Sequence, residues 1–194
     1  MKMKKLNLWF CYLLLFYFTI ITSSCSKNNG DNTNIIIDNG KIALGFDKNN
    51  GSLSLFRDIQ NSHDWFDAGS LTGSPWEIEF TKDGGIELID FRNAGKFRFS
   101  KPDPATIVLK WKKFKDPGIS RLEVEAKVSL DKDKALSYWN ISVRNYEGKL
   151  LKQVIFPRIA GLKEGGTEYL AVPQWMGQIM KDPRKNLAAI KSRI

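Results

Sequence analysis

The sequence predicts an all-β protein built as an antiparallel β-sandwich. Apolar and polar residues alternate with a period of two from residue 35 onward, and short turns of Gly, Asn and Asp separate the alternating segments. No window between residues 35 and 172 carries a sustained apolar stripe at helical spacing. Roughly ten strands joined by short turns are typical of a sandwich or barrel. The 194 residues are too few for a typical (β/α)8 barrel of about 250 residues.

The chain begins with a pattern typical of an export signal. Three lysines among residues 2–5 precede an apolar run from Leu8 to Ile21, and small residues lead from this run to Cys25. This order is typical of a secretory signal. The run's 14 residues fall short of the roughly 20 that a membrane-spanning helix needs. The small residues before Cys25 resemble the signal of bacterial lipoproteins, although Thr22 stands where that family usually has Leu.

This resemblance implies that residues 1–24 are a lipoprotein signal peptide and that Cys25 carries the lipid. Ordinary cleavage nearby, which would leave Cys25 as a free thiol, is the alternative. Residues 25–34 are polar after Cys25, and we expect them to be a tether between the lipid and the folded domain. The expected location is the bacterial cell envelope, at its periplasmic or outer-membrane surface, with the membrane as a partner through Cys25.

Cleavage would also change the charge and cysteine content of the chain. Without residues 1–24, which hold Cys11 and three lysines, 27 basic and 21 acidic residues remain, a net charge of +6. This net charge is ordinary for a soluble domain and does not demand a polyanionic partner. With Cys25 lipidated, no thiol remains for a disulfide, a nucleophile or a metal site.

The folded domain is expected at residues 35–194. The alternating segments predict strands, in order, at residues 35–37, 41–47, 52–55, 76–80, 86–88, 107–111, 121–130, 139–143 and 154–156. In the clearest of them, residues 121–130, apolar residues take every even position and mostly charged residues every odd one, which predicts one dry and one wet face. Only residues 182–194 could begin a helix. Neither a closing strand nor a helix stop precedes Ile194, which predicts a sandwich truncated at its C-terminal end.

Paired carboxylates are the first candidates for chemistry, because sugar hydrolysis usually uses two of them about 5–10 Å apart. Glu77 with Glu79, and Glu123 with Glu125, each lie two residues apart on one strand face. Each pair is also the polar half of a regular alternation, which favours a solvated surface over a catalytic pair. We therefore predict no catalytic residue in this chain.

The remaining polar patterns also favour structural interpretations. His63 is the only histidine, which excludes a site with several His ligands, and we interpret it as a loop residue. No metal site and no cofactor are predicted. Lys110–Lys115 interleaves basic and aromatic residues, a pattern that nucleic-acid binding also uses. Because Trp111 belongs to a core face, we interpret the segment as an edge strand guarded by lysines, and predict no nucleic-acid partner.

The tryptophans divide into two groups. Trp76, Trp111 and Trp139 occupy core-facing strand positions, whereas Trp65 and Trp175 lie in segments that we expect to be loops. An exposed indole offers a flat surface to the apolar face of a sugar. For Trp175, in the most distinctive of these loops, we favour packing back against the sheet, because large aromatic side chains are usually mostly buried.

The domain also resembles a known family. Its opening segments, residues 39–46 and 51–58, look like the first hairpins of a mutarotase-like β-supersandwich. So do a strand ending at Phe156-Pro157, a strand at Tyr169-Leu170 and the loop at 173–177. Together they resemble the N-terminal domain of large exported bacterial glycoside hydrolases, in which a catalytic (β/α)8 barrel follows the sandwich.

The resemblance implies a non-catalytic sandwich that supports a barrel beyond this chain, because no residue here matches that barrel's catalytic carboxylates. It implies that Trp175 and Gly177 face the next domain or the substrate cleft. A complete small lipid-anchored protein that binds an oligo- or polysaccharide, with Trp65 and Trp175 as platforms, is the alternative. A free-standing mutarotase or lyase is a third, which a single His supports weakly.

Overall fold

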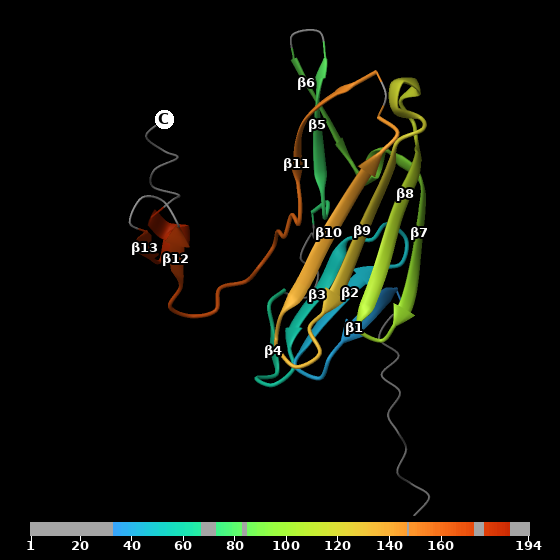
Figure 1. The fold of residues 1–194 in the computed structure, drawn as a ribbon. Helices are drawn as coiled ribbons and strands as arrows, with labels where there is room; N and C mark the ends of the chain where they lie inside the picture. The colour runs from blue at the N-terminus through green and yellow to red at the C-terminus, as the bar shows by residue number, and fades with distance from the viewer. Residues whose placement is uncertain (1–32, 67–72, 83–84, 147, 173–176, 187–194) are drawn as a thin grey trace, which may run out of the picture. The chain divides into compact units, whose positions relative to one another are not determined.

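The chain is built almost entirely of β-strands in a computed structural model that describes residues 33–66, 73–82, 85–146, 148–172 and 177–186 (Figure 1). The strands are β1 (Asn34–Asp38), β2 (Ile42–Asp47), β3 (Leu53–Asp58), β4 (His63–Asp64), β5 (Glu77–Lys82), β6 (Gly85–Asp90), β7 (Ala94–Asp103), β8 (Thr106–Phe114), β9 (Glu123–Leu130), β10 (Ser137–Arg144), β11 (Leu150–Ile155), β12 (Tyr169–Val172) and β13 (Gln178–Lys181). Two short 3-10 helices, η1 (Phe91–Asn93) and η2 (Pro117–Ile119), and a helical turn at 183–186 accompany them. No helix within these ranges is long and apolar enough to cross a membrane.

The strands form antiparallel sheets of simple connectivity. The first sheet has the order β1-β2-β3-β4, the second the order β10-β9-β8-β7, and the third the order β11-β5-β6, while β12 and β13 pair as a hairpin. Neighbours in the first two sheets are also neighbours in sequence, so short turns suffice to connect them. The third sheet needs a long connection, because β11 returns to pair with β5 after the whole second sheet.

The first two sheets enclose an apolar core, as in a sandwich. Phe46 on β2 meets Trp139 on β10 with ring centroids 5.9 Å apart. The fully buried side chains come from strands of all three larger sheets, among them Ile37, Leu44, Ile78, Phe80, Ile107, Leu109, Trp111 and Val124. Burial alternates strictly along β9, where every even-numbered residue is buried. The predicted all-β antiparallel sandwich is confirmed.

The third sheet joins this core through tryptophan. Trp76, just before β5, meets Trp111 on β8 edge to face, with centroids 5.5 Å apart. Trp76 also contacts Phe114 at 6.2 Å. The predictions that Trp76 and Trp111 are core residues are confirmed, and Trp139 packs against the core while partly exposed.

The structure also holds strands that alternation did not predict. Each segment predicted from alternation overlaps an observed strand, but β4, β7, β12 and β13 are additional, and of these only β12 was expected, from the family resemblance. The longest of these is β7, whose sequence AGKFRFSKPD contains a glycine, a proline and four charged residues that interrupt an apolar pattern. Phe97 and Phe99 alone carry its alternation, and Phe99 is exposed.

The interpretation of Lys110–Lys115 as an edge strand is wrong. Lys110 and Lys112 lie on β8, which pairs with β9 on one side and β7 on the other. The edge strand on this side of the sheet is β7, with Pro102 near its end, where a missing N–H is tolerated. Whether a strand lies at an edge or inside a sheet depends on how many strands pair with it. The alternation of β7 is too weak to predict a strand there, so the second partner of β8 was not expected.

Candidate functional site

A polar hollow lies where β5 begins and β6 ends. The antiparallel register places Glu77 directly opposite Asp90. The hollow has a volume of about 310 Å³ and is lined by Glu77, Leu88, Ile89, Asp90, Arg92 and Asn93. Two carboxylates from paired strands are the arrangement that sugar hydrolysis would need, so their partners decide what the hollow can do.

Asp90 is the N-cap residue of the 3-10 helix η1. It is buried and stands at the N-terminus of η1, where its Oδ1 accepts the Arg92 backbone N–H at 2.8 Å. In return its own N–H donates to Asn93 Oδ1 at 2.9 Å, which completes a capping box. The Arg92 guanidinium binds the other carboxylate oxygen, with its Nε 2.8 Å away, and the contact raises the pKa of Arg92.

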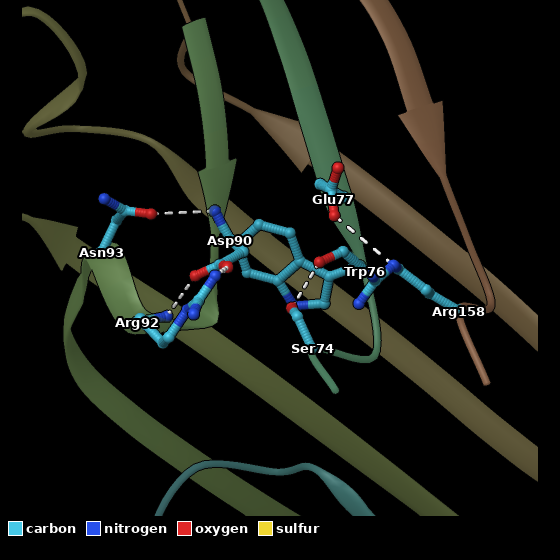
Figure 2. A network of polar contacts seen from close by, with 7 residues as sticks. All are labelled: Ser74, Trp76, Glu77, Asp90, Arg92, Asn93 and Arg158. Atoms are coloured by element: carbon cyan, nitrogen blue, oxygen red, sulfur yellow. Dashed lines mark hydrogen bonds and ion pairs between the residues drawn. The ribbon is translucent and has the colours of Figure 1, made fainter. Parts of the chain in front are cut away.

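Glu77 is held from the other side of the hollow. Figure 2 shows its carboxylate and the Arg158 guanidinium pointing toward one another, and the distance from Arg158 Nε to Glu77 Oε2 is 3.4 Å. Arg158 is fixed in turn, because its backbone N–H donates to the Pro75 carbonyl at 2.9 Å. The Ser74 hydroxyl donates to the Trp76 carbonyl at 2.5 Å. Each carboxylate of the hollow therefore faces its own arginine.

Four further glutamates on the strands are paired in the same way. The pairs are Glu79 with Lys152 at 3.6 Å, Glu87 with Lys149 at 2.5 Å, Glu123 with Lys112 at 2.5 Å and Glu125 with Lys110 at 2.7 Å. The hydrogen bond from Lys112 lowers the pKa of Glu123. A general acid in glycoside hydrolysis needs the opposite, a carboxyl whose pKa is raised toward neutrality. These contacts suit structural carboxylates.

A second candidate is the corner around Trp65, which follows β4. The indole is half-buried and meets His63 edge to face, with centroids 4.6 Å apart, and Phe56 at 6.2 Å. Gly165 lies against the ring so closely that a Cβ there would stand 3.1 Å from it. The Lys163 N–H donates to the Trp65 carbonyl at 2.9 Å. Part of the indole is therefore covered, and only the remainder could meet a ligand.

His63 departs from its predicted place. It lies on the two-residue strand β4 rather than in a loop, because it pairs with Asp58 of β3. Its Nε2 is buried without a hydrogen-bond partner among the described residues. In the described part of the chain, no three His, Cys, Asp or Glu side chains gather where they could hold a metal ion.

The other predicted site residues lie at or beyond the described ranges. Cys25 and Trp175 fall outside the described residues. Gly177 is exposed immediately before β13, with a positive φ of 81° that favours glycine. That Trp65, Trp175 and Gly177 face a carbohydrate stays a prediction.

Sequence reasoning missed Asp90, Arg92 and Arg158. The pattern of Asp90 followed by Asn93 after an alternating strand is a recognisable capping signal and could have been found. Arg158 could not, because its approach to Glu77 follows from the pairing of β11 with β5 across a long stretch of chain.

Comparison with known proteins gives a distant relative. No protein family model matches the chain. A protein of Bacteroides thetaiotaomicron named "Putative glycoside hydrolase" is 27% identical over 155 residues, which cover 77% of this chain and 22% of that protein. The chain is thus distantly related to part of a glycoside hydrolase-like protein, and spans about a fifth of that relative's length.

Substitution of Asp90 tests its capping role. Asp90→Ala leaves the Arg92 N–H without its acceptor, and we expect the free energy of unfolding to fall by about 1–2 kcal/mol. Asp90→Asn keeps an acceptor oxygen and loses only the ion pair with exposed Arg92, so its loss should stay within about 0.5 kcal/mol. Urea unfolding measures both, with Asp133→Ala, an exposed turn carboxylate, as control. An Asn variant as unstable as the Ala variant would show that the charge itself is required.

Proposed function

We propose that this chain is a non-catalytic β-sandwich of a carbohydrate-active protein of the glycoside hydrolase type, which supports a catalytic barrel beyond it. The distant relative bears a glycoside hydrolase name, and the chain matches about a fifth of its length. The antiparallel sandwich agrees with the mutarotase-like domain that the sequence resembles. The proposal assigns catalysis to the remainder of such a protein.

The pairing of the carboxylates carries this proposal. Glu77 and Asp90, the pair that shares a hollow, are each bound by an arginine. Glu123 and Glu125 are bound by lysines from β8 and by Arg144 from β10. An ion pair with a neighbouring cation is a common role for a structural carboxylate, whereas a general acid needs a carboxyl whose pKa is raised. The pairing of these four carboxylates therefore supports the proposal that catalysis belongs to another part of such a protein.

Turnover by the purified chain tests the proposal directly. We expect no release of reducing sugar from a panel of neutral and acidic polysaccharides under conditions where a commercial glycosidase mixture releases it. Glu77→Gln and Asp90→Asn are the informative variants, and Glu125→Gln is a matched control on the outer face of β9. Release that Glu77→Gln or Asp90→Asn abolishes and Glu125→Gln leaves would overturn the non-catalytic assignment.

The second candidate function is that of a small glycan-binding lipoprotein, and the half-buried indole of Trp65 favours the glycan binding. In that case Trp65→Ala should weaken binding of a neutral oligosaccharide by about tenfold, in line with loss of one aromatic stacking contact. Trp175→Ala should act likewise. Tyr138→Ala removes another exposed aromatic side chain, on β10, and should have no effect. Calorimetric titration distinguishes the candidates, because a pure scaffold shows no loss with either tryptophan variant.

We further propose that the protein is anchored in the cell envelope by lipid on Cys25. The chain offers a matched control for this proposal, because Cys11 lies within the signal region. In a Gram-negative host fed labelled palmitate, Cys25→Ser should abolish labelling and move the protein to the aqueous phase on detergent partition. Cys11→Ser should keep both properties. Labelled Cys25→Ser protein would contradict the anchor.

A further inference from the structure

We propose that the outer face of β7 and β8 binds an acidic polysaccharide, one that carries carboxylate or sulfate groups. This inference deepens the proposed function by naming a class of glycan, and it rests on that function. The site is a hollow of about 430 Å³ that we call the basic hollow. It is lined by Lys96, Arg98, Lys110, Lys112 and Lys113.

The strand register places like charges face to face. Lys96 on β7 is directly opposite Lys112 on β8, and Arg98 is directly opposite Lys110. Like charges in directly opposed positions destabilise a sheet. Repulsion from Arg98, burial, and further repulsion from Lys113 and Lys112 lower the pKa of Lys96. An anion seated between these side chains would relieve this repulsion.

Lys113 enters the hollow through a departure from regular strand geometry. Successive residues normally point to opposite faces, yet Lys112 and Lys113 both line the hollow, and Trp111 and Phe114 are both buried. Lys113 has a positive φ of 57°, a left-handed backbone conformation that is unfavourable for residues other than glycine. Gly95 on β7 permits this geometry, because a Cβ there would stand 2.5 Å from the Lys113 carbonyl oxygen.

The hollow has more cations than carboxylates to balance them. Lys110 pairs with Glu125 and Lys112 with Glu123, and Arg144 on β10 approaches both carboxylates from the far side. Among the described residues, no acidic side chain forms an ion pair with Lys96, Arg98 or Lys113. The five cations of the hollow, together with Arg144, therefore share two carboxylates, Glu123 and Glu125.

Protection of the sheet edge does not account for this arrangement. Lysines on an edge strand prevent pairing with other chains, and β7 is one of the two edge strands of this sheet. Lys110 and Lys112 belong to β8, which is already paired on both sides and needs no such protection. The concentration of charge thus extends beyond what an edge requires.

The arrangement favours an acidic polysaccharide over a nucleic acid. Paired strands lie about 4.8 Å apart and alternate residues of one strand about 6.7 Å apart. The cations on β7 and β8 occupy such regularly spaced backbone positions, so they can meet a line of anionic groups. Arg98 can bind a carboxylate or sulfate through two parallel hydrogen bonds. Single-stranded nucleic acids also need aromatic surfaces for base stacking. Trp111 and Phe97, which interleave with these cations in sequence, pack together instead, with Trp111 fully buried.

Titration of the full chain with defined polysaccharides tests the inference. The probes are polygalacturonate for carboxylate groups, chondroitin sulfate for sulfate groups, and dextran as a neutral control. The Lys96→Gln/Arg98→Gln double variant should bind the acidic probes about tenfold more weakly and show a shallower salt dependence, because two counterion-releasing contacts are lost. Lys132→Gln/Lys134→Gln removes the same charge from exposed positions in the β9–β10 turn and should change affinity by less than about twofold. Lys113→Gln is a second variant of the hollow. It lies on β8 and leaves every residue of β7 unchanged.

Each outcome is decisive. Preference for one acidic probe tells which anionic group the basic hollow recognises. Equal losses in both double variants would mean attraction to net charge alone and would overturn the inference. The inference would also be overturned if dextran bound as tightly as the acidic probes. It would be overturned as well if single-stranded DNA or anionic vesicles bound more tightly than these probes, with the same sensitivity to Lys96 and Arg98. Binding of a neutral oligosaccharide that depends on Trp65 but not on the hollow would overturn this inference and leave a carbohydrate function intact.

Discussion

The packing of the Trp111 indole is the interaction on which the rest of the structure depends, because the three larger sheets meet there. Trp111 belongs to the second sheet and packs edge to face on Trp76, which precedes the first strand of the third sheet in the chain. Its Nε1–H donates to the Asn50 carbonyl, which lies next to the first sheet, at 2.8 Å. Gly51 approaches the ring so closely that a Cβ there would lie 2.8 Å from it. A large buried aromatic side chain contributes several kcal/mol when its neighbours close around it. Burial of Trp111 thereby fixes which residues of β8 face inward.

The outer face of the second sheet follows from that constraint. Once Trp111, Leu109 and Ile107 face the core, Lys110 and Lys112 must face outward, and pairing brings the cations of β7 beside them. Exposed ion pairs contribute little to stability. The packing of the core therefore determines which charged residues lie on this face, but their ion pairs are not needed to hold the core together. A face of this kind can specialise in binding without loss of the fold.

Much of the fold could be predicted from the sequence, because alternation is a local signal. Residues 121–130 alternate without interruption, and β9 follows this pattern. The signal fails on β7, where Gly95 and Pro102 serve the geometry of an edge strand and leave few apolar residues. The wrong placement of Lys110–Lys115 at an edge follows from that one missing strand. The hollow between Glu77 and Asp90 could not be predicted for a related reason. It depends on which residues lie opposite one another when the two strands pair.

The net charge illustrates the same limit for function. A value of +6 after removal of residues 1–24 is unremarkable, and taken alone it indicates no anionic partner. What matters is where the charges gather. The left-handed backbone of Lys113 returns Phe114 to the core beside Trp76 and at the same time adds a cation to the outer face. Gly95 is the residue that allows both, since any side chain there would collide with the Lys113 carbonyl. One strained position thus links the packing of the core to the charge of the surface.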